Sequence, residues 1–584
     1  MIEPQRQTEH RGSDDLLTAG LGLDGLRSMV PPVFADPARP TPEELRRRAI
    51  WNNWRGIADL SSTGGYGEVY GSVARIPGRE FSAFATLEGA GQPHRVLVQV
   101  PDNFDDDKRC VLVTASSGSR GIYGAIAVAG AWGLPRGCAV AYTDKGAGTD
   151  YYDIDTHTGV RLDGTRGSAE ETLAFRPGVP VASTGVAFKH AHSGDNPEAD
   201  WGKHVKQAAE FALSALSRAI PQAAPFTFDN TRVIAVGISN GGGAVLRAAE
   251  ILGSRADEGW LDAVVAAEPN VYVAGHGGRT LYDYTTEAAL LMPCALLHLP
   301  VGSLPQPPLA TQLAVLGAAR CSSLKTSGAV SGEDSTVQAR SAYEQLRASG
   351  WTDKALVAGA ASVGFDMWRA VAATYASAYD RAGIGEHPCG FSFAAQNPDS
   401  SSREATAAER AAWFADASGI PPGAGVGLMD SRLQAAPDAT LPGLKCLREL
   451  LTRAPDSAFQ QALVATRSAL PREGLPVVVI HGLDDGLVPP AFSSVPYVAA
   501  AQAAGRQVSY WQVENAQHFD GFLAFPAYGA RYVPVLPYVY AALDQVTAHL
   551  DGAAALPVDA VIQAKARGEG LVEQAQFAIP PQRK

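Results

Sequence analysis

Cysteine is scarce in this sequence, with six residues among 584, and no two of them form a C-x-x-C pair. A structural zinc site built on closely spaced cysteines therefore has no support. Cys110 and Cys138 fall in or beside strands that we predict for the core, so they are interpreted as buried small hydrophobic side chains. The remaining four cysteines can form disulfides, but their spacing does not decide the pairing: Cys294, Cys321, Cys389 and Cys446.

Long hydrophobic runs and basic runs are also missing. No apolar run approaches the roughly 18 residues that a membrane helix needs, so we expect no membrane partner. The 48 Lys and Arg against 60 Asp and Glu give a net charge of −12, which disfavours a nucleic-acid partner. Residues 1–17 lack the charged-then-apolar pattern of a signal peptide, so we expect a soluble chain that is either cytoplasmic or already processed.

The glycine-rich loops lack a phosphate-binding motif, because no G-K-[ST] follows SSGSRG (116–121) or NGGGA (240–244). The apolar content of 46% and charged content of 18% are those of an ordinary globular protein. A length of 584 residues exceeds one compact core, which predicts either several domains or one large fold with an insertion.

Apolar strands alternate with helices through much of the chain. Continuous apolar strands at 94–101, 110–115 and 232–237, with an amphipathic helix at 201–220, indicate a parallel sheet covered on both faces. Residues 270–470 have a mainly helical pattern, and the strand–helix rhythm resumes from Leu475. The sequence therefore predicts an α/β fold interrupted by a helical insertion, divided as follows: an N-terminal extension (1–90), a catalytic domain (91–270 and 471–550), a cap insertion (271–470) and a C-terminal tail (551–584).

A serine stands between glycines where a predicted strand passes into a helix. Residues 237–241 read Gly-Ile-Ser-Asn-Gly, which fits G-x-S-x-G in the strand–turn–helix context of a nucleophile elbow. A serine hydroxyl is a weak nucleophile, so Ser239 needs a base and the base needs an orienting acid. By itself the motif also occurs by chance, and glycines alone are explained by a sharp turn.

Candidates for the base and the acid follow in the order expected of an α/β-hydrolase. Asp485 lies on the loop after the strand 475–482, 246 residues beyond Ser239, and His518 follows the strand 507–514. We predict that Ser239, Asp485 and His518 form a catalytic triad on an α/β-hydrolase fold. Three neighbours compete for these roles or are interpreted as structural: Asp484, Asp520 and His481.

Ester chemistry also needs donors for a developing oxyanion. The backbone N–H of Asn240 follows the nucleophile, and a second N–H is expected from the loop after the strand 110–115. We predict Ser119 or Gly118 for that second donor. Neither a metal nor an organic cofactor is required.

Several blocks of sequence carry a resemblance that is more specific than the elbow. The chain resembles bacterial D-(−)-3-hydroxybutyrate oligomer hydrolases in these blocks: DDLLTAGLG (14–22), FKHAHSGDNPEADWGKH (188–204), ISNGGGAVLRAAE (238–250) and LPYVY (536–540). The resemblance implies a serine carboxylesterase that cleaves short ester-linked oligomers of (R)-3-hydroxybutyrate to monomer, with Ser239 at the family's nucleophile position. Asp485 and His518 rest on the general hydrolase pattern. Many such hydrolases are made with secretion signals, which leaves the location of this chain open.

A more distant likeness is to tannases and feruloyl esterases, which share a large insertion before the acid. In that group a disulfide typically joins cysteines preceding the serine and the histidine, where this chain has Ile238 and Gln517. This departure counts against tannase-type function. A broader aromatic or polyester esterase, an acyltransferase or peptidase, and a non-catalytic binder on the same fold remain alternatives, and the oligomeric state stays open.

The implied substrate is a small ester with one terminal carboxylate, so a cation is expected near the site. The candidates lie close to the motifs, and each taken singly is better explained as a surface or structural charge: Arg120, Lys189, His190, His192 and Arg247. The helical insertion is expected to roof the site and to favour short chains over a polymer surface.

Overall fold

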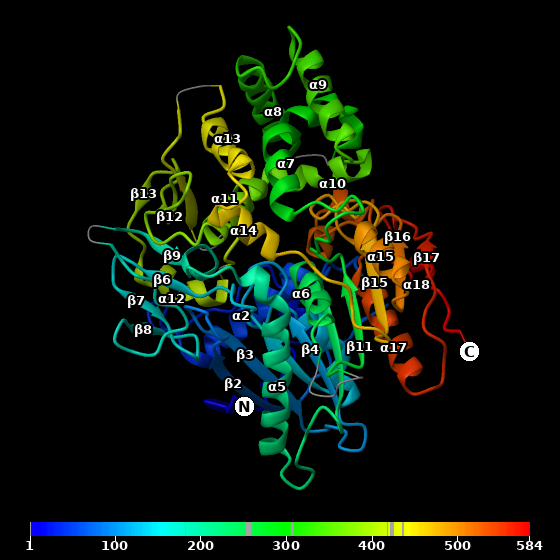
Figure 1. Cartoon of the computed structure of the whole chain (residues 1–584). Coiled ribbons are helices and arrows are strands. Elements are labelled where there is room, and N and C mark those ends of the chain that lie inside the picture. Colours follow the sequence, from blue (N-terminus) through cyan, green and yellow to red (C-terminus); the bar gives the residue numbers. More distant parts are fainter. Residues whose placement is uncertain are drawn as a thin grey trace.

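A ten-stranded sheet forms the centre of the protein (Figure 1). The computed structural model describes residues 2–180, 183–252, 259–304, 309–416, 418–420, 425–434 and 437–583. From β5 to β17 all neighbouring strands are parallel, whereas β1, β2 and β3 add an antiparallel edge. The strand order is β1 (Arg6–His10), β2 (Gly78–Ala85), β3 (His94–Pro101), β5 (Ala139–Thr143), β4 (Cys110–Ala115), β10 (Arg232–Ile238), β11 (Ala263–Ala267), β15 (Val477–Gly482), β16 (Val508–Val513) and β17 (Ala560–Ile562).

The central strands are buried on both faces because their side chains alternate between two separate cores. In β10, Ile234 and Val236 pack into one core while Val233 and Ala235 pack into the other. The helices α5 (Trp201–Ala219), α6 (Asn240–Ala248) and α15 (Ser494–Ala503) cover one face, and α2 (Pro42–Ile57) and α17 (Leu536–Leu550) cover the other. This arrangement confirms the predicted α/β-hydrolase fold class.

Strand register aligns the carboxyl ends of four neighbouring strands. Ile238 pairs with Ala267, Ala267 with Ile480, and Gly482 with Val513. The residues that follow β10, β11, β15 and β16 therefore meet at one edge of the sheet.

Both ends of the chain contribute strands to this sheet. β1 and β2 come from the first 90 residues, and β17 comes from the last 34 residues, 551–584. These segments are predicted from the sequence as an extension and a tail, and β1 in particular reads RQTEH, with no apolar residue to mark a strand. Helix α2 begins with a capping box in which Thr41 and Glu44 bond each other's backbone N–H groups.

The insertion between β11 and β15 has a hydrophobic core of its own. Figure 1 shows its helices, green to yellow, stacked beyond one end of the sheet. Its helices are α7 (Leu281–Ala295), α8 (Leu309–Thr326), α9 (Ser335–Ala348), α10 (Asp353–Gly364), α11 (Met367–Tyr379), α12 (Ala407–Asp416), α13 (Leu441–Glu449) and α14 (Ala458–Ala465).

Two small antiparallel sheets were not expected from the sequence. One lies in the insertion and comprises β12 (Phe391–Gln396), β13 (Ser402–Arg403) and β14 (Val426–Asp430). The other precedes α5 and comprises β6 (Tyr151–Asp153), β7 (Thr158–Val160), β8 (Arg166–Ser168) and β9 (Val186–Phe188). Strands of two to six residues are too short to show a clear alternation in the sequence.

All six cysteines are paired. The interpretation of Cys110 and Cys138 as separate hydrophobic side chains is wrong, because they form a disulfide with a Cα–Cα distance of 4.7 Å. Cys110 starts β4 and Cys138 immediately precedes β5, so parallel pairing of these strands brings the two residues together. The other two disulfides lie in the insertion and join Cys294 to Cys321 and Cys389 to Cys446.

Within the described ranges, no helix combines the length and apolar character needed to cross a membrane.

Candidate active site

Ser239 occupies a strained turn between β10 and α6. Its φ of 60° and ψ of −126° lie outside the regions that non-glycine residues normally adopt. The turn closes tightly: a Cβ on Gly237 would lie 2.3 Å from the Gly241 carbonyl oxygen, and one on Gly241 would lie 2.5 Å from the Ala115 oxygen. The two glycines of G-x-S-x-G are therefore required by this close approach.

His518 and Asp485 are brought to Ser239 by the aligned strand ends. His518 Nε2 lies 2.8 Å from Ser239 Oγ, and His518 Nδ1 lies 2.7 Å from Asp485 Oδ2. Asp485 follows β15 and His518 follows β16, so two neighbouring parallel strands deliver them to the same edge. This continuous hydrogen-bonded chain is the geometry that a serine nucleophile and its base require.

The competing residues have other partners. Asp484 forms an ion pair with Lys354 at 3.3 Å. Asp520 accepts hydrogen bonds from the backbone N–H groups of Val535 and Leu536, at the start of α17.

Asp485 is a fully buried carboxylate held by several donors. The backbone N–H groups of Leu487 and Val488 each donate to its Oδ1 at 2.8 Å. His481 Nε2 lies 3.1 Å from its Oδ2. Burial alone raises the pKa of Asp485, but the neighbouring His518 and His481 outweigh burial and hold that pKa well below its usual value. Asp485 is therefore ionised beside His518.

Glu268 is a second buried carboxyl group at the same histidine, and sequence reasoning missed it. It directly follows β11, and its Oε2 lies 3.7 Å from His518 Nδ1. Burial, reinforced by the charge of Asp485, raises the pKa of Glu268 well above its usual value, which favours the protonated form of this group. The sequence carries one signal for Glu268: it directly follows an apolar strand, which is the next strand in the chain after the one that ends just before Ser239.

Glu268, Asp485 and His518 also place three potential metal-ligand atoms within 4.8 Å of one another. His518 Nδ1 and Asp485 Oδ2 are only 2.7 Å apart, which is a hydrogen-bond distance. Two ligands of one ion, each about 2.0–2.2 Å from it in tetrahedral geometry, lie farther apart than this. The cluster fits a histidine–carboxylate pair better than a metal site.

The predicted oxyanion residues lie beside Ser239. Asn240 is the first residue of α6, so its N–H is among those without an acceptor inside the helix. Gly118 and Ser119 line the same pocket as Ser239. The buried Lys145 Nζ donates to the Gly118 carbonyl and to Ser116 Oγ, and burial lowers the pKa of Lys145 to about 7.

A buried polar chain supports Asn240 from behind. Its side-chain amide donates to the hydroxyl of Tyr375 on α11 at 2.9 Å, and its Oδ1 accepts from Asn270 at 3.0 Å. Asn270 also donates to Glu198, which accepts a short hydrogen bond from Tyr379. Burial raises the pKa of Glu198 to about 7. The insertion is thus connected by hydrogen bonds to the residue after the nucleophile.

A cavity of about 370 Å³ opens over Ser239. Its walls come from the end of α2, the loop 117–120, the insertion and the segment 518–525. Apolar groups dominate the lining, including Leu281, Met367, Val371, Ile420, Phe519, Phe522 and Phe525. A small ester with apolar methyl branches suits such a lining.

The five candidate cations differ in their partners and in whether they line the cavity over Ser239. Lys189 is buried between Asp144 and Asp150 at 3.4 and 3.5 Å. His190 Nδ1 lies 2.7 Å from Ser119 Oγ. The remaining two outside the cavity lining, His192 and Arg247, hydrogen-bond to backbone groups. Arg120 alone among the five lines the cavity over Ser239.

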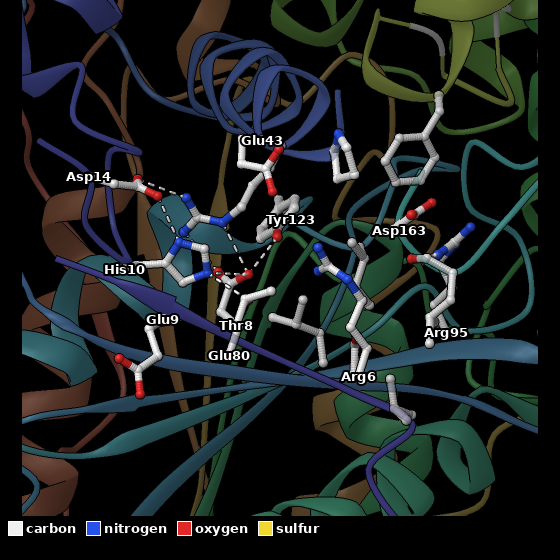
Figure 2. Close-up of a pocket in the computed structure, with 18 residues that line it drawn as sticks. Arg6, Thr8, Glu9, His10, Asp14, Glu43, Glu80, Arg95, Tyr123 and Asp163 are labelled. Carbon is white, nitrogen blue, oxygen red and sulfur yellow. Dashed lines mark hydrogen bonds and ion pairs between the residues drawn. The ribbon is translucent and has the colours of Figure 1, made fainter. Parts of the chain in front are cut away.

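A second cavity, of about 300 Å³, lies between β1, β2 and the start of α2. Figure 2 shows His10, Asp14 and Glu80 gathered on one side of it. His10 Nδ1 lies 2.7 Å from Asp14, while Arg46 pairs with Asp14 at 3.0 Å and with Glu80 at 2.9 Å. These charges neutralise one another, so we interpret the cluster as a structural connection between the first strands and α2.

A family model and the most similar relatives point to the same protein family. Residues 5–582 match the family model described as 3HB-oligomer hydrolase. A relative from Paracidovorax citrulli (strain AAC00-1), named D-(-)-3-hydroxybutyrate oligomer hydrolase, is 38% identical, covering 96% of this chain and 89% of its own. A relative of the same name from Burkholderia vietnamiensis (strain G4 / LMG 22486) is 39% identical, covering 96% and 88%.

Among solved structures, Candida antarctica lipase A in its closed state aligns with a TM-score of 0.36 and 12% identity, covering 86% of this chain and 85% of that one. The fold is assigned from the strand order of the central sheet and not from this structural alignment. The sequence match, in contrast, extends over nearly every residue, and the chain belongs to the 3HB-oligomer hydrolase family.

Proposed function

We propose that the protein is a serine carboxylesterase that hydrolyses ester-linked (R)-3-hydroxybutyrate dimers and short oligomers to monomer. The observation that carries the proposal is the chain of hydrogen bonds from Ser239 through His518 to Asp485, with distances of 2.8 and 2.7 Å. The names of the relatives supply the substrate class.

In the proposed mechanism, Ser239 Oγ attacks the ester carbonyl while His518 Nε2 accepts its proton. Asp485 stabilises the imidazolium that forms, because it is already ionised. His518 then donates the proton to the departing 3-hydroxyl oxygen, which leaves an acyl group on Ser239. Water, deprotonated by the same histidine, hydrolyses this acyl-enzyme.

The oxyanion of each tetrahedral intermediate is assigned to the N–H groups of Asn240 and Ser119. Lys145 Nζ donates a hydrogen bond to the carbonyl oxygen of Gly118. In a trans peptide the N–H of the next residue, Ser119, points in the direction opposite to that carbonyl. The N–H of Ser119 therefore points away from Lys145, which favours Ser119 over Gly118 as the second donor. Donors fixed before the reaction stabilise developing charge without reorganisation.

The insertion is assigned the role of a cap. Leu281, Met367, Val371 and Tyr375 contribute from it to the lining of the cavity that also includes Ser239. A roofed cavity of about 370 Å³ accommodates a short oligomer and excludes a polymer surface.

The test is monomer release from (R)-3-hydroxybutyrate dimer and trimer, with wild type measured beside Ser239→Ala. We expect release by wild type and a loss in the variant of several orders of magnitude, because a residual rate without the nucleophile comes only from binding and the oxyanion donors. A wild type that ignores both oligomers but cleaves p-nitrophenyl butyrate through Ser239 contradicts the substrate and keeps the nucleophile.

A further inference from the structure

Arg120 is a cation at the active-site cavity without a carboxylate partner. It directly follows the loop that carries Ser119, and it lines the same cavity as Ser239. Its guanidinium lies against Gly56 at the end of α2, where Nη2 donates to the Gly56 carbonyl at 3.3 Å. Among the described residues, no carboxylate lies within 4.0 Å of the guanidinium.

The fully buried arginines of the described chain are neutralised. Four of them form ion pairs with buried carboxylates: Arg46 with Glu80, Arg95 with Asp150, Arg320 with Asp438 and Arg410 with Asp153. An unpaired charge removed from water is costly, so such pairing is the rule for buried arginines. Arg120 is only half-buried and lines the cavity over Ser239, where, like Arg55 of the same lining, it has no carboxylate partner among the described residues.

The guanidinium nevertheless keeps its charge and its donors. Burial lowers the pKa of Arg120 to about 10, so the group is protonated at pH 7. Within the described chain, none of its nitrogen atoms is both sealed from solvent and unbonded, so the N–H groups that Gly56 does not use reach solvent, on a residue that lines the cavity. Asp520, the acidic residue among the described lining residues, already accepts hydrogen bonds from the backbone N–H groups of Val535 and Leu536.

We propose that Arg120 binds the terminal carboxylate of the substrate and thereby selects oligomers with a free carboxyl end. This inference rests on the proposed function. A linear hydroxybutyrate oligomer has one carboxylate, and a planar guanidinium with several free N–H groups suits a carboxylate through paired hydrogen bonds.

This contact fixes the direction of cleavage. Whichever ester is attacked, the free carboxylate belongs to the fragment that leaves as an alcohol, and the hydroxyl-terminal fragment stays on Ser239. Binding through Arg120 therefore makes each turnover remove a fragment from the carboxyl end. The carboxylate itself forms and breaks no bond, so Arg120 acts on specificity, and its loss is expected mainly in KM.

The experiment compares (R)-3-hydroxybutyrate dimer with its methyl ester, in wild type and Arg120→Met. For the free acid we expect kcat/KM of the variant to fall about 10- to 100-fold, the worth of a charge-assisted hydrogen-bond pair, mostly through KM. For the methyl ester, which has no charge to bind, we expect kcat/KM to stay near that of wild type. Arg120→Lys is expected to recover part of the loss.

The matched control is Arg55→Met, which removes a charge from the same cavity. The Arg55 guanidinium is already bonded to the carbonyls of residues 26–28, so this variant is expected to treat the acid and the methyl ester alike. An Arg120→Met enzyme that loses equal activity on both substrates, or none on the acid, overturns the inference.

A separate measurement tests the contact between Arg120 and a carboxylate even if the proposed substrate is wrong. If wild type cleaves neither dimer form, competitive inhibition of p-nitrophenyl butyrate hydrolysis by butyrate tests the same carboxylate contact. Inhibition that weakens at least tenfold in Arg120→Met supports the assignment, and unchanged inhibition overturns it. Turnover of the nitrophenyl ester also reports that the variant is folded.

Discussion

Asp485 and Glu268 are two buried carboxyl groups beside one imidazole, and their pKa values are shifted in opposite directions. Asp485 accepts two backbone N–H bonds and faces His481 and His518, so its pKa is lowered. Glu268 has burial and the charge of Asp485 acting against ionisation, so its pKa is raised. Two adjacent negative charges are thereby avoided, and only Asp485 is suited to stabilise an imidazolium.

Amide substitutions separate the two carboxyl groups. We expect Asp485→Asn to lower kcat by roughly three to four orders of magnitude, because the amide cannot stabilise the imidazolium or hold the correct tautomer. The raised pKa favours the protonated form of Glu268, and Glu268→Gln introduces a neutral amide of the same shape, so its kcat is expected to remain within a few-fold of wild type. Hydrolysis of p-nitrophenyl butyrate at pH 7 measures both. Equal losses in the two variants would mean that Glu268 shares the role of the acid.

Helix α2 connects the edge of the sheet to the active site. Near its first turn, Arg46 pairs with Glu80 on β2 and with Asp14, while its last residues line the cavity and contact Arg120. The first 90 residues therefore build part of the site. Removing one member of a buried ion pair leaves the other uncompensated, which is more harmful than removing both.

We expect Arg46→Met to lower the free energy of unfolding by about 3–5 kcal/mol. The variant Arg46→Met/Glu80→Gln is expected to regain much of this loss, and chemical denaturation measures both. In wild type the pKa of Glu80 is held well below its usual value, although burial opposes this, because Arg46 and His10 are adjacent. The folded state thus binds fewer protons than the unfolded state near pH 4.5, so this contribution is present above that pH and is lost on acidification.

In Arg46→Met the carboxyl group of Glu80 is buried with much less positive charge around it. The stabilising contribution of ionised Glu80 is therefore expected to shrink. The difference in stability between wild type and the variant should therefore narrow as the pH falls below 4.5. A difference that stays constant between pH 7 and pH 4 would contradict the electrostatic origin.

Features marked by local sequence signals were predictable, and features that depend on distant partners were not. Ser239, Asp485 and His518 could be located because each follows a buried strand, and parallel strands end at one edge. Strand β1 could not, because RQTEH carries no apolar periodicity. The isolation of Arg120 could not either, because ion pairs such as Arg410 with Asp153 join residues far apart in the chain. Whether an arginine has a carboxylate partner emerges only from the complete fold.

The three disulfides divide between the two parts of the molecule. Cys110–Cys138 joins the amino ends of β4 and β5, at the edge of the sheet opposite Ser239. Cys389–Cys446 lies in the insertion, where it ties the segment before β12 to α13. Helix α11, which carries Met367, Val371 and Tyr375 into the cavity, packs against α13. We therefore expect loss of Cys389–Cys446 to affect the substrate site, and loss of Cys110–Cys138 not to affect it.

Removing either Cys110–Cys138 or Cys389–Cys446 by paired Cys→Ala changes tests this division. By loop-closure entropy, bridges that span 28 and 57 residues contribute about 3–4 kcal/mol each, so both variants are expected to have a lower Tm. Only Cys389→Ala/Cys446→Ala is expected to raise KM for the hydroxybutyrate trimer, because a loosened insertion no longer holds the cavity wall in place. Cys110→Ala/Cys138→Ala is the matched control and should keep the wild-type KM at a temperature where both variants are folded. A rise in KM in the control, or none in the insertion variant, would show that the cavity wall is not held by the fold of the insertion.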